Sequence, residues 1–120
     1  MSNISNPSVL SSSTISGDAV VNRQGESLGK VEDLMIDLDG NRVTYAVLSF
    51  GGFMGMGNKL FAVPFESLEL DGPNKRFILD VPKDRLESAP GFDKDNWPNF
   101  ADRTWAGTIY SHYGRSPYWS

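Results

Sequence analysis

The sequence predicts an all-β protein, a small antiparallel barrel or sandwich of six short strands. Three observations lead to this fold class. Short runs rich in aliphatic and aromatic residues recur at close spacing along residues 19–81. Turn-forming pairs such as Asp39-Gly40 and Asp71-Gly72 separate these runs. The composition changes after Pro82, where the pattern of short strands stops.

Each strand is expected from its alternating or continuous apolar residues. The third and fourth strands flank a loop, residues 51–57, in which four of seven residues are glycine. The Asp39-Gly40 pair favours a tight reversal between the second and third strands. Pro64 ends the fourth strand because proline has no N–H to donate to a central ladder. The six expected strands cover residues 19–21, 28–37, 43–50, 60–63, 68–70 and 76–81.

The segments outside the strands divide the chain into three parts. Residues 1–15 are rich in serine and asparagine and are expected to form a flexible N-terminal arm. Residues 16–82 form the predicted barrel. Residues 83–120 are expected to begin with a short helical turn at 83–88, stopped by Pro90 and Gly91, and to continue as an irregular extension.

The C-terminal extension is rich in aromatic residues and contains all three tryptophans of the chain. Unfolded tails are poor in such residues. We therefore predict an ordered arm that lies over the barrel or over a neighbouring subunit. The aromatic residues concerned are Phe92, Trp97, Phe100, Trp105, Tyr110, Tyr113, Tyr118 and Trp119.

The bulk composition excludes several classes of function. The 120 residues suit one domain, and a net charge of −4 without a basic stripe argues against a nucleic-acid partner. The lack of cysteine excludes disulfides, thiol catalysis and thiolate metal sites. No apolar run approaches the roughly 18–20 residues of a membrane helix, and the N-terminus does not resemble a secretory signal. A cytoplasmic protein is expected.

Four blocks of sequence occur in an order that is more specific than any one of them. The blocks are 16–22 (SGDAVVN), 25–34 (GESLGKVEDL), 42–50 (RVTYAVLSF) and 60–65 (LFAVPF). Together they resemble the PRC-barrel domain, the small β-barrel shared by the cytoplasmic H subunit of the bacterial photosynthetic reaction centre and a ribosome-maturation factor. The resemblance covers residues 16–92, and the stretch 92–98 (FDKDNWP) is similar to a tail of stand-alone bacterial members.

The resemblance implies a six-stranded PRC-type barrel that serves as a docking or scaffolding module. It implies no catalytic residues, because the family has no agreed catalytic set. The chain does not show the membrane helix that precedes the barrel in an H subunit, nor a second domain that handles RNA. A direct photosynthetic role and a role in ribosome assembly are therefore not expected.

The glycine loop invites comparison with a phosphate-binding loop, because two glycines bracket four residues and a lysine follows. That motif requires glycine, lysine and a hydroxyl residue in succession, with a helix behind them. Here Asn58 precedes Lys59, Leu60 replaces the hydroxyl residue, and the next element is a predicted strand. We interpret the loop as a projecting connection whose apolar tip, Phe53 and Met54, contacts a partner.

Acidic residues occur in two stretches that resemble functional sites. Residues 37–41 (DLDGN) open like a calcium loop, but Arg42 stands at the position of the invariant glycine and Leu48 at that of the bidentate glutamate. A hairpin turn is favoured there. Paired carboxylates perform acid–base chemistry only where burial splits their pKa values. A solvated surface is favoured for the second group, which comprises Asp84, Glu87, Asp93, Asp95 and Asp102.

His112 is the only histidine, which excludes multi-histidine metal sites and histidine relays. Ser111 beside it does not make a triad, because neighbours in sequence do not arrange a nucleophile and its base as required. We interpret His112 as a surface or packing residue. The aromatic residues of the arm are interpreted as packing residues too, since no basic residues are interleaved as base stacking requires.

These observations predict a non-enzymatic protein-interaction or scaffolding module that forms a homodimer and has no catalytic, cofactor or metal site. The apolar loop tip and the aromatic arm would cover barrel surface, with exchange of the arm between subunits as one route. The alternative is a sensor that binds a small ligand or metal through the glycine loop and Asp33, Asp37 or Lys59. The candidate interaction surface consists of Phe53, Met54, Met56, Trp97, Phe100, Trp105, Tyr110 and Tyr113.

Overall fold

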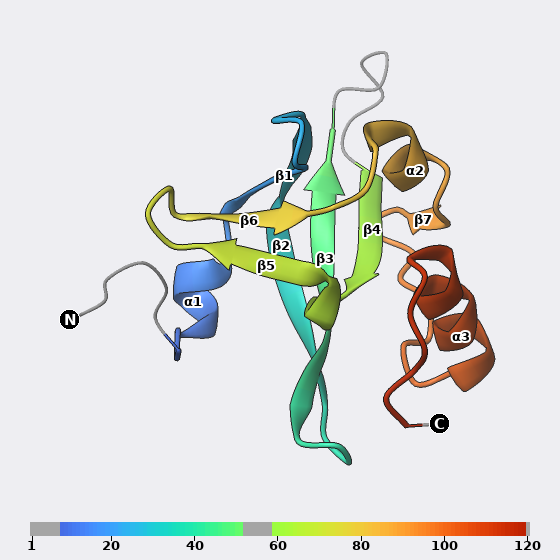
Figure 1. The fold of residues 1–120 in the computed structure, drawn as a ribbon. Coiled ribbons are helices and arrows are strands. Elements are labelled where there is room, and N and C mark those ends of the chain that lie inside the picture. The colour runs from blue at the N-terminus through green and yellow to red at the C-terminus, as the bar shows by residue number, and fades with distance from the viewer. Residues whose placement is uncertain (1–7, 52–58, 120) are drawn as a thin grey trace.

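The computed structural model describes residues 8–51 and 59–119 of the chain (Figure 1). Its strands are β1 (Ala19–Val21), β2 (Ser27–Asp37), β3 (Arg42–Phe50), β4 (Lys59–Pro64), β5 (Leu68–Asp71), β6 (Arg76–Leu79) and β7 (Gly91–Phe92). Its helices are α1 (Ser12–Ile15), α2 (Lys83–Glu87) and α3 (Arg103–His112), with a 3₁₀ turn at Phe65–Ser67. No helix among the described residues is long and apolar enough to span a membrane.

The strands form one sheet in the order β5-β6-β1-β2-β3-β4-β7. Neighbouring strands are antiparallel except β1 and β6, which run parallel with Val20 opposite Phe77. The strand-rich, mostly antiparallel fold is thus as expected, but two details differ. The short β7 adds a seventh strand, and the described sheet does not close, because β5 and β7 remain its two edges.

The β2–β3 hairpin is the longest feature of the sheet and projects beyond the other strands (Figure 1). The predicted reversal at Asp39-Gly40 is present, and Asn41 takes the left-handed conformation that it requires, with φ of 54°. The Asp37 carboxylate accepts the backbone N–H groups of Asp39 and Gly40 at 3.0 and 3.1 Å. The turn is therefore fixed by its own side chain as well as by the strand register.

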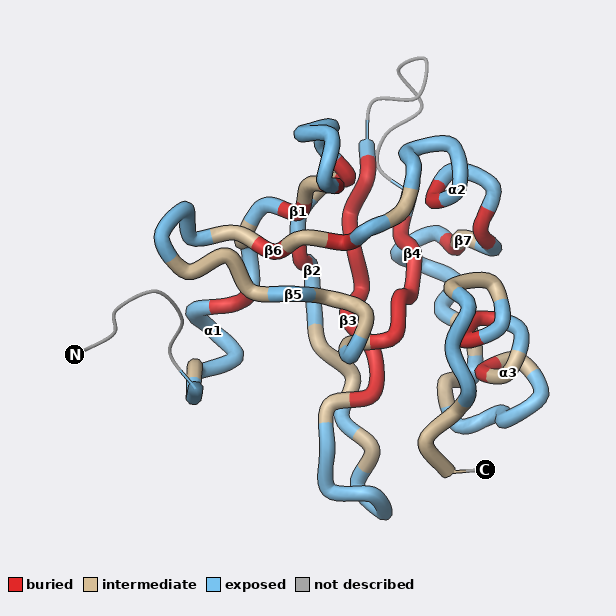
Figure 2. Tube along the Cα trace, in the orientation of Figure 1, coloured by how far each residue is buried: buried red, intermediate tan, exposed pale blue. Residues whose placement is uncertain are grey.

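Strand β3 is buried on both faces, which explains its uninterrupted apolar run (Figure 2). Successive side chains of a strand point to opposite sides of a sheet. Ala46, Leu48 and Phe50 belong to one cluster of buried residues. Tyr45 and Val47 belong to another. The same strand therefore divides two hydrophobic cores.

We call the first cluster the barrel core. It lies between the curved sheet, α1 and α2, and most of its members are aliphatic. Its buried residues are Ile15, Val20, Leu28, Val31, Ala46, Leu48, Phe50, Phe61, Val63, Phe77, Leu79, Leu86 and Ala89.

The second cluster, the arm core, lies between the opposite face of β3 and β4 and the C-terminal part of the chain. It is dominated by aromatic rings. Its buried residues are Tyr45, Val47, Leu60, Ala62, Phe92, Ala106, Ile109 and Tyr110. Met35, Phe100, Trp105, Tyr113, Tyr118 and Trp119 pack against them.

Gly29 is required where β2 crosses close to β3. Its φ is +99°, and a Cβ atom built there would lie 2.2 Å from the Ser49 carbonyl oxygen. Both the left-handed conformation and the close backbone approach exclude a larger residue. The two strands can therefore curve together at this point.

Helix α3 corrects the expectation of an irregular extension. It begins at the Asp102 N-cap, whose carboxylate accepts the N–H groups of Thr104 and Trp105 at 2.9 and 3.4 Å. Ala106, Ile109 and Tyr110 form its buried face. The expected short helix at 83–88 is present as α2.

The C-terminal part is fastened to the rest of the chain by side-chain hydrogen bonds. Arg85 of α2 donates twice to the His112 carbonyl oxygen, at 3.1 and 2.7 Å. The His112 ring lies 2.9 Å from the Arg85 carbonyl oxygen, which only accepts, so Nε2 carries the proton. Arg115 donates to Ser67 at 2.7 Å. These contacts tie α3 to α2 and to the turn after β4.

Candidate functional site

The predicted interaction surface divides into two groups in the structure. The loop-tip residues Phe53, Met54 and Met56 lie outside the described residues. The other five, Trp97, Phe100, Trp105, Tyr110 and Tyr113, all belong to the arm and its core or pack against it. Trp97 is 37% exposed, and the others are buried or half-buried.

The aromatic residues of the arm pack on the sheet of their own chain. Tyr45 of β3 lies at the centre, with the rings of Phe100, Trp105 and Tyr110 at centroid distances of 5.6, 5.6 and 5.7 Å. Phe100 and Trp105 themselves stack edge to face at 5.0 Å. Tilted and edge-to-face pairs at such distances are the favourable arrangements of aromatic rings. The arm is therefore an ordered part of this fold.

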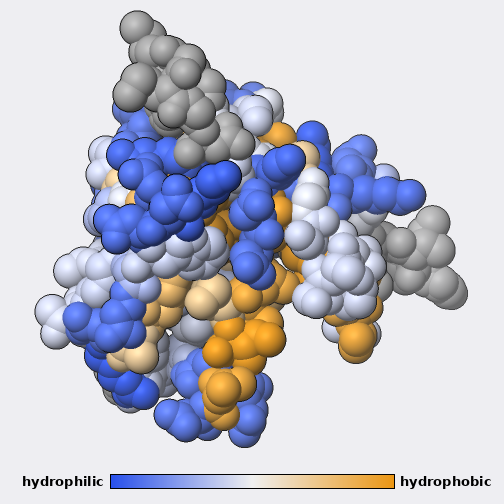
Figure 3. All heavy atoms as spheres, turned by 180° about the vertical axis from the view of Figure 1, so that it is seen from behind, coloured by the Kyte–Doolittle hydropathy of each residue, from blue (hydrophilic) through white to orange (hydrophobic). Residues whose placement is uncertain are grey.

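A cavity of about 340 Å³ lies between the β2–β3 hairpin and the arm. The molecular surface is hollowed there when viewed from behind, beside the apolar hairpin (Figure 3). One wall comes from the hairpin and the other from α3 and its two flanking segments. The lining residues are Met35, Ile36, Asp37, Leu38, Asp39, Thr44, Tyr45, Phe100, Ala101, Arg103, Ala106, Tyr118 and Trp119.

A hydrogen bond joins the two walls of this cavity. The Tyr118 hydroxyl donates to the Asp37 carboxylate, which brings the chain's end onto the hairpin. This bond, with the N–H of Gly40, lowers the pKa of Asp37. Burial and the same bond raise the pKa of Tyr118. Gly40 leaves room for the contact, because a Cβ atom there would lie 3.3 Å from the Tyr118 ring.

Two arginines cover aromatic rings of the same wall. The Arg42 guanidinium carbon lies 4.0 Å from the centre of the Tyr118 ring. Arg103 lies 4.9 Å from the centre of the Trp119 ring. Such cation–π contacts hold the terminal residues against the hairpin and α3.

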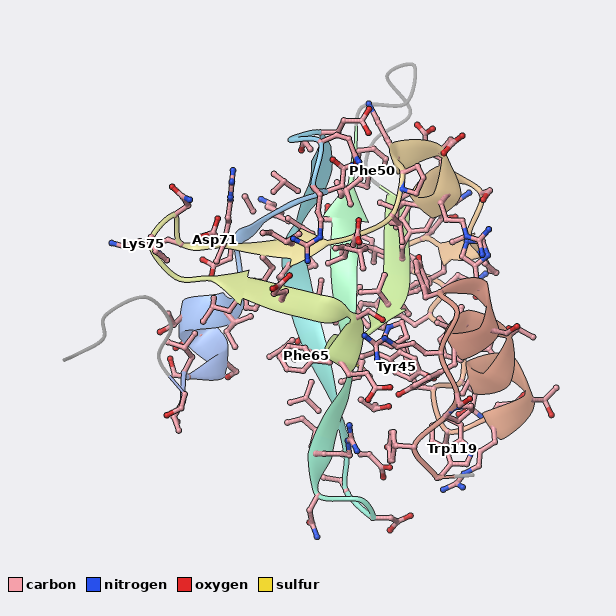
Figure 4. The ribbon with its side chains drawn as sticks, viewed as in Figure 1. Tyr45, Phe50, Phe65, Asp71, Lys75 and Trp119 are labelled. Atoms are coloured by element: carbon pink, nitrogen blue, oxygen red, sulfur yellow. The ribbon has the colours of Figure 1, made fainter. Side chains whose placement is uncertain are left out.

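Two tyrosine hydroxyls are buried without a hydrogen-bond partner among the described residues, those of Tyr45 and Tyr113. Tyr45 is 1% exposed and lines the cavity, on the side of the sheet that faces α3 (Figure 4). Tyr113 packs between the two cores and does not line the cavity. Burial raises the pKa of both hydroxyls, so both stay protonated.

A second hollow is an apolar groove of about 440 Å³ on the side of α1. It lies between α1, the base of the hairpin and the β5–β6 pair. Its lining residues are Ser8, Val9, Leu10, Ser12, Ile15, Leu34, Val43, Phe65, Leu68, Leu70 and Phe77. Sequence reasoning did not single out this groove, because its residues come from six separate elements and from the segment before α1.

Residues 52–57 of the glycine loop of the predicted sensor lie outside the described residues, and two of its other candidates, Asp37 and Lys59, lie far apart. Asp37 pairs with Arg42 at one end of β3, whereas Lys59 pairs with Phe50 at the other end. The carboxylates considered for acid–base chemistry are also dispersed: Asp102 caps α3, and Asp93 and Asp95 are exposed. Among residues 8–51 and 59–119 no three metal-ligating side chains form a group.

A comparison with known protein families agrees with the strand-rich fold. A family profile described as "PRC-barrel domain" matches residues 7–86, well over half of the chain. The chain belongs to the PRC-barrel domain family. The match includes the sheet from β1 to β6 and most of α2, and it ends before β7 and α3. A search of the curated proteins finds no match. Membership in the PRC-barrel family identifies a small barrel module and leaves its role open.

Proposed function

We propose that this PRC-barrel chain is a non-enzymatic protein-interaction module of the cytoplasm and that it acts as a homodimer. The observation that supports the proposal is a set of large apolar side chains that the fold leaves in solvent. Val9, Ile36 and Leu38 are 84%, 60% and 82% exposed. Ile36 and Leu38 lie two residues apart on the hairpin, and exposed apolar side chains that gather in this way indicate a protein interface.

These side chains belong to two surfaces, a projecting ridge and a groove. Ile36 and Leu38 make the projecting hairpin an apolar ridge (Figure 3). Val9 stands at the border of the groove beside α1. A second copy of the chain is a suitable partner, because in a two-fold dimer the ridge of each subunit can contact the groove of the other. The same contact is then made twice. Each contact would bury the ridge of one subunit in the groove of the other.

The proposed surface differs from the one expected from the sequence. The arm already covers the sheet of its own chain, so the aromatic side chains there are engaged. Ile36 and Leu38 both precede the Asp39-Gly40 turn, and their exposure follows from the projection of the hairpin past the other strands. In this proposal the arm stabilises the fold of its own chain, and the hairpin contacts the partner.

The experiment is sedimentation velocity over a hundredfold range of protein concentration. The wild-type chain is expected to sediment as a dimer that dissociates on dilution. The double variant Ile36→Ser and Leu38→Ser is expected to be monomeric with an unchanged far-UV spectrum. A wild-type chain that remains a monomer at every concentration would contradict the proposal.

The matched control is Trp97→Ser, which removes an exposed apolar side chain from the arm. It is expected to leave the dimer intact, because Trp97 lies outside both the ridge and the groove. Dissociation by Trp97→Ser but not by the hairpin variant would assign the interface to the arm instead. Val9→Ser should weaken the dimer from the groove side.

A further inference from the structure

The tripeptide Leu-Asp-Gly occurs twice in the chain, each time at a turn that follows a strand. Residues 38–40 form the tip of the β2–β3 hairpin, and residues 70–72 lead into the turn between β5 and β6 (Figure 4). In an Asp-Gly pair the glycine nitrogen can attack the side-chain carboxyl carbon of the aspartate, because glycine has no Cβ atom to hinder it. The local sequence is the same at both sites, so their surroundings decide which of them reacts.

The reaction requires only water. The glycine nitrogen loses its proton and forms a C–N bond to the carboxyl carbon, while a C–O bond breaks and the hydroxyl leaves as water. Hydrolysis of the resulting succinimide takes up water and opens the ring at either carbonyl. One product is the original aspartate, and the other is isoaspartate, in which the main chain runs through the former side chain. Because the carboxyl must be protonated to lose its hydroxyl, contacts that keep it ionised slow the reaction.

Asp71 is held in such contacts. Its carboxylate accepts hydrogen bonds from the side chains of Asn74 and Arg76, both at 2.9 Å. Its side chain is only 16% exposed. The bonds from Asn74 and Arg76 lower the pKa of Asp71, which keeps the carboxylate ionised. The same bonds fix the orientation of the carboxyl group, so it cannot turn towards the nitrogen of Gly72.

Asp39 lies in the opposite environment. It is exposed, like the rest of the turn over residues 38–41, and its carboxylate makes no hydrogen bond or ion pair to the described residues. The Gly40 N–H donates to Asp37 at 3.1 Å, and the nitrogen must leave this bond before it attacks. Hydrogen bonds in exposed turns open locally far more often than those of a core. This bond therefore delays the attack and does not prevent it.

We infer that Asp39 is a site of spontaneous isoaspartate formation in the folded chain, and that Asp71 is protected from the same reaction. The inference does not rest on the proposed dimer. An isoaspartate lengthens the main chain of the hairpin turn by one carbon atom. Asp37 accepts both N–H groups of this turn and also the Tyr118 hydroxyl. The modification therefore alters the contact between the hairpin and the arm.

The test is incubation of the full-length chain at mildly acidic pH, followed by digestion with trypsin. The two sites fall on separate peptides, residues 31–42 with Asp39 and residues 60–75 with Asp71. Isomeric peptides are separated by reversed-phase chromatography, and electron-transfer fragmentation locates the isoaspartate. Its mass is unchanged, which distinguishes it from deamidation of Asn41. Isoaspartate is expected to accumulate several times faster at Asp39 than at Asp71.

The unfolded chain is the reference for this comparison. In concentrated urea the two sites are expected to react at similar rates, because the local sequence is then all that remains. The folded samples are incubated at the lowest concentration of the sedimentation series, where the proposed dimer is expected to be dissociated. Failure of this test and failure of the dimer proposal are therefore distinguishable.

Two variants test the cause of the difference. Arg76→Gln removes the cation bonded to Asp71. It is expected to raise the rate at Asp71 towards that at Asp39 and to leave the rate at Asp39 unchanged. Asp39→Glu keeps the charge but would have to close a larger and less favourable ring. No isomer is expected at position 39 in this variant.

Three results would overturn the inference. The first is that Asp71 reacts as fast as Asp39 in the folded chain, or faster. The second is that the folded chain forms no isoaspartate at Asp39 whereas the chain in urea does. The third is that Arg76→Gln leaves the rate at Asp71 unchanged, which would show that the contacts of Asp71 do not protect it.

Discussion

The barrel core and the arm core share one strand but differ in chemistry. The barrel core is mainly aliphatic, and all of its buried residues except Ala89 lie within the part of the chain that matches the family. The arm core is mainly aromatic, and Phe92, Ala106, Ile109 and Tyr110 come from beyond the end of that match at residue 86. The C-terminal arm thus converts an outer face of the small barrel into a second core.

The two regions also differ in whether their buried polar groups form hydrogen bonds. Asn22, at the edge of the barrel, is 2% exposed and makes four hydrogen bonds, to Glu26 twice, to Gln24 and to Val81. Tyr45 in the arm core and Tyr113, between the cores, have hydroxyls without a partner in the described structure. A satisfied group fixes a structure, whereas an unsatisfied one costs stability. The arm core is thus where a substitution can still remove an unpaired polar group.

The largest effect is expected from deletion of residues 93–120. The deletion exposes β3 and β4 side chains such as Val47 and Leu60, whose burial alone contributes roughly 3–6 kcal/mol. We expect a lower melting temperature and a tendency to aggregate, measured by circular dichroism and light scattering. Unchanged melting after the deletion would show that the arm is a separable addition and that the two cores are independent.

Truncations within each core sharpen the comparison. Leu48→Ala in the barrel core and Ile109→Ala in the arm core each remove a side chain that is fully buried. Each is expected to cost about 2–5 kcal/mol in denaturant unfolding. Hydrogen exchange should distinguish them: Ile109→Ala should lower protection first in α3, and Leu48→Ala across the sheet. Equal loss of protection everywhere in both variants would mean that the cores unfold as one unit.

A smaller effect is expected at the start of α3. Asp102→Ala removes the carboxylate that accepts the N–H groups of Thr104 and Trp105. The expected cost is about 0.5–2 kcal/mol, because two of the first N–H groups of the helix lose their acceptor. Asp95→Ala is the control, since Asp95 is exposed and lies outside the helix. If the two variants melted at the same temperature, the cap would contribute nothing.

Most elements of the barrel core could be predicted from the sequence, whereas few elements of the arm core could. The period-two pattern and the Asp39-Gly40 pair located the central strands, because these signals are local. Helix α3 was missed although Asp102 and the spacing of Trp105, Ile109 and Tyr113 signal it, since Gly107 and two threonines weaken the pattern. Strand β7 has two residues and exists only through its pairing with β4.

The candidate cavity could not be predicted from the sequence for a different reason. Its walls join residues of the β2–β3 hairpin, such as Asp37 and Tyr45, to Tyr118, which lies 81 positions after Asp37 and meets it only after α3 has packed on β3. Tyr45 looked like one member of an apolar strand. Its missing hydrogen-bond partner is a property of the folded environment, and no local pattern records it.

The contact between the arm and the hairpin should depend on pH. The Tyr118 hydroxyl lowers the pKa of Asp37 in the folded chain, so the folded state favours the ionised carboxylate. That stabilisation is complete above the pKa of an unfolded aspartate, about 4, and is lost as the pH falls through the lower folded value. We therefore expect wild type to melt higher than Asp37→Asn at pH 6, with the difference disappearing in acid.

The control for this titration is Asp39→Asn, whose carboxylate neighbours Asp37 in the turn and makes no hydrogen bond to the described residues. Its melting temperature should follow that of the wild-type chain at every pH. A difference between wild type and Asp37→Asn that persists unchanged to pH 2 would show that the bond to Tyr118 does not depend on the charge of Asp37.

The smallest effect, neutral or favourable, is expected from removing the two tyrosine hydroxyls that have no hydrogen-bond partner among the described residues. Tyr113→Phe and Tyr45→Phe each remove a buried oxygen that has no partner among the described residues, so the melting temperature should stay the same or rise. Tyr110→Phe is the contrast, because its hydroxyl lies 3.4 Å from that of Thr44. It should cost about 0.5–1.5 kcal/mol in denaturant unfolding. A loss of that size in Tyr113→Phe would mean that its hydroxyl is paired in solution, and the contrast with Asn22 would no longer hold.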